Sequence, residues 1–290
     1  MRVVENWSSR FLHGFFLLVV LSLVTGQQLV MAETSNTVLS VKKEYTMGVF
    51  PHLPPRQLEK VFAPMAKDLG NAINRNIVLR TNTTYKKFAH NLDNEKFDIA
   101  FIQPFDYIRV ADKLGYLPLV TRKEKLTSIL VVKTDSPIES IADIRGKRVA
   151  FPPAIAAVSR LMKAHFKNNK LLPDKDVTIS HHRSHVSCMQ QILIGEADAC
   201  GTAAPALRFF QHKMKVKLKV IAETDPVPHT LFAIHPRVPE YEREIIRERM
   251  VNWAKTTEGR KLLDTGKLSS FIPIENSAYD IVREFDKQSH

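Results

Sequence analysis

Two short apolar runs, S-I-L-V-V at residues 128–132 and L-F-A-I at residues 231–234, indicate how this chain is divided. Both runs have the length and the branched or aromatic side chains of a buried strand. One unit of alternating strands and helices precedes the first run, and a second unit lies between the two. The pattern therefore predicts that the chain passes from one lobe to another and back through two hinge strands.

The unit before residue 128 alternates strand and helix patterns. Residues 45–50, 77–79 and 97–102 are short apolar strands, residues 58–69 carry apolar side chains at helical spacing, and a helix is expected from Pro104 to Gly115. The unit after residue 132 repeats the alternation: strands are expected at 149–151, 177–179, 197–200 and 216–221, with helices at 158–166 and 186–194. Repeated strand-helix-strand units predict an α/β fold whose sheets are mainly parallel.

The first residues have the pattern of a secretory signal peptide. A basic start precedes an apolar run from Phe11 to Val24, and V-M-A stands before Glu33. We expect cleavage after Ala32, with an uncleaved anchor as the alternative. No later apolar run approaches the length that spans a membrane, so the mature protein is expected to be soluble and outside the cytoplasm.

These patterns predict the domain limits. Residues 1–32 are the signal peptide, residues 33–130 together with 233–290 form lobe 1, and residues 131–232 form lobe 2.

The formal net charge of +12 favours anionic partners and fits a solvated basic surface. The lysines between 213 and 219 alternate with apolar residues, as on the exposed face of a strand. No nucleic-acid-binding motif occurs, and we expect no such partner. The sequence also has no hydrolase, zinc-protease or nucleotide-binding motif. We therefore expect no enzyme activity, no cofactor and no metal.

The two cysteines allow two interpretations. An oxidising compartment permits a disulfide between Cys188 and Cys200. Because both lie in apolar surroundings, two buried free thiols are an equal alternative.

Several segments resemble the periplasmic phosphonate/phosphite-binding proteins of ABC transporters. They are G-V-F-P at 48–51, F-D-I-A-F-I-Q-P-F-D-Y at 97–107, T-S-I-L-V-V at 127–132, D-S-P-I-E-S-I-A-D-I-R-G-K-R-V-A-F at 135–151, and the stretch from S-H-V at 184 to G-E-A-D-A at 199. The resemblance covers most of the mature chain. It implies the two-lobed type II periplasmic binding protein fold, with two hinge strands.

This sequence departs from those relatives in two places. Their segment after the A-F strand is rich in hydroxyl side chains, which hold phosphonate oxygens at a helix start. Here residues 152–159 read P-P-A-I-A-A-V-S, so only the N–H groups near Ala156 and Ala157 remain to face a ligand. Relatives often carry an Asp after the G-E-A-D-A strand, where this chain has Gly201-Thr202-Ala203. The departures weaken the phosphonate, and above all the aminophosphonate, assignment.

Ligand contacts are expected where strands end and helices begin, at the wall of a cleft between the lobes. The resemblance implies a contact for Tyr107 and for His185, whose imidazole could bind an anion. The predicted ligand-binding set is His52, Tyr85, Gln103, Tyr107, Phe151, Ala156, Ala157, His185 and Thr202. A metal site built on His182, His185 and Cys188 is the less favoured alternative, since no established ligand spacing is met.

We therefore expect a monomeric periplasmic solute-binding protein. It would capture a small anionic ligand, a phosphonate-, phosphite- or phosphate-like oxyanion, for an ABC permease. The alternatives are a ligand-sensing partner of a membrane histidine kinase and a metal- or metalloid-binding protein.

Overall fold

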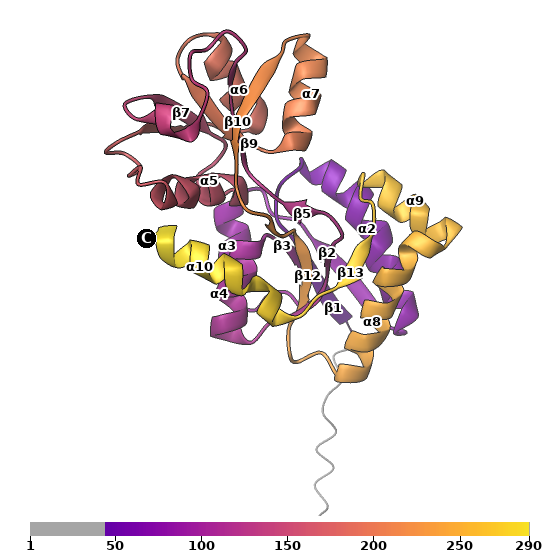
Figure 1. Ribbon diagram of the computed structural model, residues 1–290. Helices are drawn as coiled ribbons and strands as arrows, with labels where there is room; N and C mark the ends of the chain where they lie inside the picture. Colours follow the sequence, from indigo (N-terminus) through magenta and orange to yellow (C-terminus); the bar gives the residue numbers. More distant parts are fainter. Residues whose placement is uncertain (1–43, 290) are drawn as a thin grey trace, which may run out of the picture. The chain divides into compact units, whose positions relative to one another are not determined.

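The computed structural model describes residues 44–289, with side chains through Lys287 (Figure 1). The predicted signal peptide and the next residues, through 43, lie outside the described residues. In the part that is described, no helix combines the length and the apolarity that crossing a membrane requires.

The first sheet has six strands in the order β13-β4-β12-β3-β1-β2. β1 is parallel to β2 and β3, whereas β12 is antiparallel to both β3 and β4. The carboxyl ends of β1, β2, β3 and β4 therefore share one edge with the amino end of β12. The strands are β1 (Glu44–Val49), β2 (Asn76–Arg80), β3 (Ile99–Ile102), β4 (Leu117–Arg122), β12 (Leu231–Ile234) and β13 (Phe271–Pro273).

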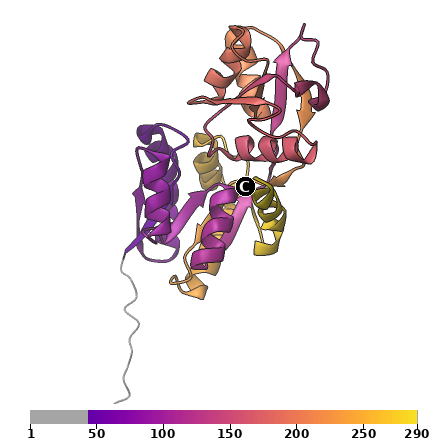
Figure 2. The ribbon, with the colours of Figure 1, turned by 90° about the vertical axis from the view of Figure 1, so that its left-hand side faces the viewer.

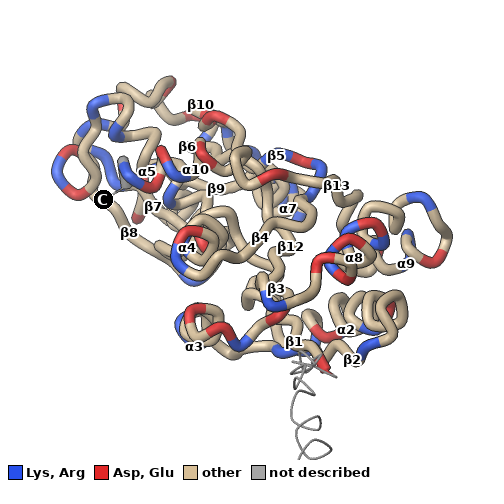
Figure 3. The backbone as a smooth tube through the Cα atoms, turned by 90° about the horizontal axis from the view of Figure 1, so that it is seen from below, with Lys and Arg blue, Asp and Glu red and all other residues tan. Residues whose placement is uncertain are grey.

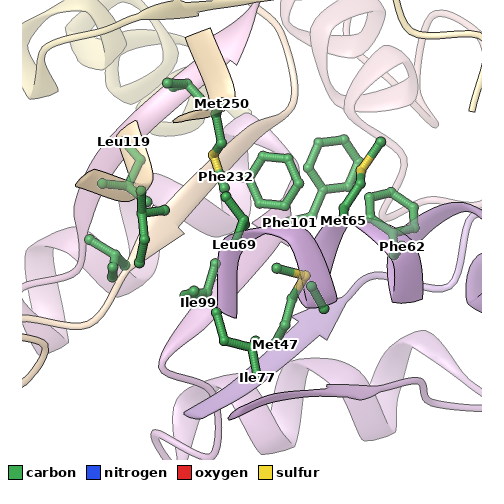
Figure 4. Packing of buried hydrophobic residues seen from close by; sticks show 14 of the residues in the cluster. Met47, Phe62, Met65, Leu69, Ile77, Ile99, Phe101, Leu119, Phe232 and Met250 are labelled. Carbon is green, nitrogen blue, oxygen red and sulfur yellow. The ribbon is translucent and has the colours of Figure 1, made fainter. Parts of the chain in front are cut away.

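The helices around this sheet begin and end at residues suited to those positions. Thr84 caps α3 by accepting a hydrogen bond from the Lys87 N–H, and Gly115 ends α4 with a left-handed φ of 72°. Phe62, Met65 and Leu69 of α2 pack against the sheet in the core (Figure 4). The helices are α2 (Pro55–Ala72), α3 (Tyr85–Asp93), α4 (Pro104–Leu114), α8 (Glu240–Asn252), α9 (Thr257–Thr265) and α10 (Asp280–Ser289), with short 3-10 turns η2 (Trp253–Lys255) and η3 (Asn276–Tyr279).

The second sheet has five strands in the order β10-β6-β9-β7-β8. β7 is parallel to β8 and β9, and β6 is antiparallel to β9 and β10. Its strands are β6 (Ile129–Lys133), β7 (Arg148–Phe151), β8 (Thr178–His181), β9 (Ala199–Thr202) and β10 (Leu218–Glu223). Its helices are α5 (Ala157–Asn168), α6 (His185–Leu193), α7 (Ala204–Met214) and the 3-10 turn η1 (Ile141–Ile144).

The chain crosses between the sheets at residues 123–128 and 224–230. Within these segments the short strands β5 (Lys125–Leu126) and β11 (Val227–Pro228) pair with each other, antiparallel. Each crossing joins the carboxyl edge of one sheet to the carboxyl edge of the other, so the two edges face each other. The expected α/β fold with two connecting strands is confirmed.

The apolar runs that opened the sequence argument each belong to one sheet. β6 lies inside the second sheet and β12 inside the first. The predicted domain limits, after residues 130 and 232, fall within these strands. We propose that the lobes change in the crossing segments instead.

Phe151 lies in the core of the second sheet. Its side chain has no exposed surface and packs against Phe166. A Cβ added to Gly201 would lie 2.2 Å from Cε1 of the Phe151 ring, so the ring fits only because residue 201 is glycine. Phe151, expected as a ligand contact, is therefore covered by neighbouring side chains.

This contact predicts that Gly201→Ala destabilises the protein by about 1–3 kcal/mol, the usual cost of overpacking a core. Urea unfolding measures the change. Shortening the opposing ring with Phe151→Leu in the Gly201→Ala background should cost less than the sum of the two single changes. Strict additivity would contradict the contact.

A disulfide joins Cys188 of α6 to Cys200 of β9. Both residues are buried in a hydrophobic cluster with Met189 and Phe210. Of the two interpretations of the cysteines, the structure has the bonded pair. The alternative metal set that used a Cys188 thiolate thus loses that ligand.

Replacing both cysteines by alanine should lower the free energy of unfolding by about 3 kcal/mol, because the bond restricts the unfolded chain. Urea unfolding of both proteins with and without reductant provides the test. Reductant should destabilise the wild-type protein and leave the variant unchanged; equal responses would contradict the bond.

Candidate functional site

Most predicted site residues lie at the two facing carboxyl edges. His52 follows β1, and Gln103 precedes α4 at the end of β3. In the second sheet, His185 begins α6 and Thr202 ends β9. Ligand sites of α/β proteins form at such edges.

The two edges touch at the start of α5. The Gln103 side-chain oxygen accepts a hydrogen bond of 3.0 Å from the Ala157 N–H, and the Ala156 N–H donates to the Pro153 carbonyl. Both amides expected to face a ligand therefore have partners within the protein. Gln103 occupies the helix start where an anion was expected.

Helix α5 also packs against α10, as Figures 1 and 2 both show. Leu161 and Ala164 are fully buried in a cluster with Val282 and other first-lobe side chains. The Arg160 guanidinium lies 4.0 Å from the centre of the Phe105 ring and forms an ion pair with Asp286. Polar and apolar contacts thus hold α5 to helices of the first lobe.

A groove of about 820 Å³ lies where α3, α4, α5 and α10 meet. Its volume is in the range of small-molecule sites. Acidic and basic residues both occur on α4 and α10, whereas Arg160, Lys163 and Lys167 make the charged face of α5 basic (Figure 3). The lining residues are Tyr85, Ala89, Phe105, Asp106, Ile108, Arg109, Asp112, Lys113, Ala154, Ile155, Arg160, Lys163, Arg283, Asp286 and Lys287.

Asp106 is the buried carboxyl group of this groove, with 6% of its surface exposed. Burial raises its pKa to about 6, against the opposing effects of Tyr85 and Arg160. Burial and the neighbouring Asp106 also raise the pKa of Tyr85. Of the predicted site residues, Tyr85 alone lines this groove.

Tyr107 is fully buried away from the groove. Its hydroxyl donates to the Asn276 side-chain oxygen at 2.8 Å, and its ring packs 4.6 Å from that of Tyr279. The hydroxyl that the resemblance assigned to a ligand therefore has a partner within the first lobe. The sequence pattern could not reveal this, because Asn276 lies 169 residues away.

The structure brings His185 and Thr202 together. The His185 Nδ1 lies 2.8 Å from the Thr202 hydroxyl oxygen, and burial lowers the pKa of the imidazole. Thr202 is fully buried, which leaves His185 as the member of the pair with exposed surface.

The neighbouring histidines have separate partners. His182 Nε2 lies 3.0 Å from the Ser180 hydroxyl and His181 Nδ1 lies 3.0 Å from the Pro152 carbonyl. Among the residues of 44–289, no group of three or more His, Cys, Asp or Glu could hold a metal ion.

His52 stacks on Phe50, with ring centres 4.4 Å apart, and its Nδ1 donates to the Phe50 carbonyl. The residue keeps exposed surface, but desolvation beside these rings lowers the pKa of His52, the Phe50 hydrogen bond opposes this, and the charge of Arg122 lowers the pKa further. Arg122 ends β4, and His229 stands two residues before β12. No sequence pattern pointed to either residue, because they meet only through the insertion of β12 beside β4.

The chain is similar to a known family along most of its length. A model of the family described as ABC transporter, phosphonate, periplasmic substrate-binding protein matches residues 47–279.

Solved structures share the fold at low sequence identity. PhnD1 of Prochlorococcus marinus in complex with methylphosphonate has a TM-score of 0.72 and 16% identity over 85% of this chain and 98% of that one. A binding protein of a phosphonate ABC transporter from Pseudomonas aeruginosa has a TM-score of 0.69 and 15% identity over 85% and 86%. A Xanthomonas citri protein bound to ATP has a TM-score of 0.72 and 13% identity over 85% and 97%.

The raised pKa of Asp106 predicts a pH dependence of stability. The folded protein holds the Asp106 proton more tightly than the unfolded chain does. The stabilisation that this proton gives the folded protein is therefore fully present below the unfolded pKa near 3.8. It is lost as the pH rises through about 6. Asp106 should therefore lower the free energy of unfolding by about 2 kcal/mol between pH 4 and pH 7.5.

Asp106→Asn lacks this titration. Urea unfolding of wild type and variant at both pH values isolates the effect, because all other groups are common to the two proteins. Relative to wild type, the variant should gain stability as the pH rises. Equal pH dependence would contradict the assignment.

Proposed function

This chain belongs to the family of periplasmic substrate-binding proteins of phosphonate ABC transporters, and from that premise we propose that it captures a small phosphorus oxyanion. Members of this family are the substrate-binding components of transporters, a role without catalysis. The candidate ligands are phosphonates, phosphite and phosphate. An aminophosphonate is the least suitable phosphonate, because Gly201-Thr202-Ala203 lacks the Asp that relatives often carry there and that would suit an amino group.

The meeting of the two carboxyl edges supports this proposal most strongly. Hydrogen-bond donors from both sheets gather there: His52 and Arg122 from the first, and His185 from the second. Imidazole and guanidinium donors suit an oxyanion, which accepts hydrogen bonds and carries charge. In this arrangement His185 binds through Nε2, since Nδ1 faces Thr202.

Binding is proposed to act through closure of the two edges. The crossing strands β5 and β11 join the lobes, and the Gln103–Ala157 hydrogen bond already links the edges in this structure. A ligand that contacts both edges favours the closed state over an open one by its difference in affinity for the two. Hinge closure around a ligand is the usual motion of periplasmic binding proteins.

The membrane partner is proposed to be an ABC permease, with the protein acting as a monomer after export and cleavage behind Ala32. Pull-down of the full-length protein from membranes identifies the partner. Recovery of a permease supports transport, whereas recovery of a sensor kinase alone would replace it with a sensing role.

Isothermal calorimetry with methylphosphonate, phosphite, phosphate and sulfate tests the ligand class. A probe at a hundred times its dissociation constant should also add about 2.7 kcal/mol of stability in a thermal-shift experiment. The proposed ligand class would be refuted if none of the phosphorus oxyanions gave a response.

His185→Ala should weaken binding of the responsive probe about tenfold or more, because a hydrogen bond to a charged group is lost. His212→Ala is the matched control, since His212 is an exposed histidine near the end of α7. Equal affinity of both variants and wild type would remove His185 from the site.

A further inference from the structure

Arg122 and His229 form a pair of hydrogen-bond donors at the carboxyl edge of the first sheet. Backbone contacts fix both residues: the Arg122 N–H donates to the Thr230 carbonyl, and the Thr121 hydroxyl donates to the His229 carbonyl. These contacts tie the end of β4 to the segment that leads from β11 into β12. The pair therefore lies where a crossing segment enters the first sheet.

The protonation of His229 follows from its neighbours. The Thr230 N–H donates to His229 Nδ1 at 2.7 Å, so the proton of the neutral ring is on Nε2. Burial, and next the charge of Arg122, lower the pKa of His229 to about 3, against the opposing charge of Glu124. The ring is thus neutral at physiological pH and presents an Nε2–H donor.

That donor faces a second donor. His229 Nε2 lies 3.5 Å from Arg122 Nη1, and neither atom can accept a hydrogen bond from the other in this tautomer. The Arg122 Nε is buried without a hydrogen-bond partner among the described residues. The nearest carboxylate oxygen, of Glu124, is 3.5 Å from this Nε, too far for a good hydrogen bond.

Glu124 forms an ion pair with Arg122, but at 3.5 Å its carboxylate is too far from Nε for a good hydrogen bond. Its side chain is 43% exposed, compared with 24% for Arg122. The hydrogen bond from Ser269 lowers the pKa of Glu124 more than the charge of Arg122 does, although burial opposes both. The Arg122 Nε and, in this tautomer, the His229 Nε2–H thus lack a good acceptor, and burial of unpaired donors is costly.

We propose that Arg122 and His229 hold the anionic head group of the ligand, from the first lobe. One oxyanion oxygen can accept from Arg122 Nη1 and from His229 Nε2–H, which satisfies both donors. This inference rests on the proposed function, which it deepens by naming the residues that recognise the charge. It also accounts for the hydroxyl-poor segment of the second lobe, because the charge is then bound mainly on the opposite edge.

The anion position beside β11 has a further consequence for recognition. A neutral His229 and a permanently charged Arg122 supply one positive charge, which the Glu124 carboxylate offsets in part. A fully ionised phosphonate or phosphate head therefore keeps negative charge that His52 and His185 can reduce only by accepting a proton. Monoanionic heads are expected to bind with the weaker pH dependence.

Calorimetry with methylphosphonate, phosphite, phosphate and sulfate on the full chain tests the pair. Arg122→Gln should weaken binding of the probe that responds about tenfold or more. Arg122→Lys should weaken binding less, since lysine keeps the positive charge and loses only the forked guanidinium donors. Arg247→Gln is the matched control, because Arg247 pairs with Glu244 on α8. Urea unfolding verifies that each variant is folded.

Nuclear magnetic resonance of the His229 ring gives a readout that a structural role alone would not move. In wild type, Nδ1 should be unprotonated, and adding methylphosphonate should raise the pKa of His229, because the anion offsets the charge of Arg122. Arg122→Gln should raise this pKa without ligand and abolish the further rise.

The outcomes separate the two proposals. If a probe binds wild type and Arg122→Gln with equal affinity, the Arg122–His229 pair is refuted and the proposed function stands. If no phosphorus oxyanion binds wild type, the proposed function and the pair fall together.

Discussion

The packing of α5 against the first lobe is the contact on which the arrangement of this protein depends. Both crossing segments leave and enter at carboxyl edges, so covalent connectivity alone would let the sheets swing apart. The buried Leu161 and Ala164 side chains resist that motion, because separation returns apolar surface to water. The ion pair of Arg160 with Asp286 and the Gln103–Ala157 hydrogen bond lie at the same contact. Because polar contacts are directional, they fix the orientation of α5 against the first lobe.

The sequence was a good guide to elements and a poor guide to their neighbours. Helical spacing in α2, the proline that begins α4 and the glycine after it are local signals, and the structure has these helices where they were expected. The family resemblance supplied the arrangement of the two sheets. The lysine-rich stretch was misjudged: Lys213 lies in α7 and Lys215 ends it with a φ of 53°, so only its last part is strand.

The sequence predicted which site residues lie at the ends of strands. It did not predict which of their side chains are exposed. His185 and Thr202 were both named, and the structure adds that they contact each other. Phe151 and Tyr107 are covered, because Gly201 and Asn276 offer space and a hydrogen-bond acceptor from distant parts of the chain. Arg122 and His229 carried no motif, since their contact arises only when β12 is inserted antiparallel beside β4.

The position of α10 near the end of the chain matters for handling the protein. Its residue Asp286 lies only four positions before His290, yet it anchors the helix that belongs to the other sheet. A purification tag fused to the carboxyl terminus would continue directly from this anchor. It could alter how far the two edges separate, and with it the affinity measured. An amino-terminal tag, placed after the expected cleavage point, adds nothing to α10.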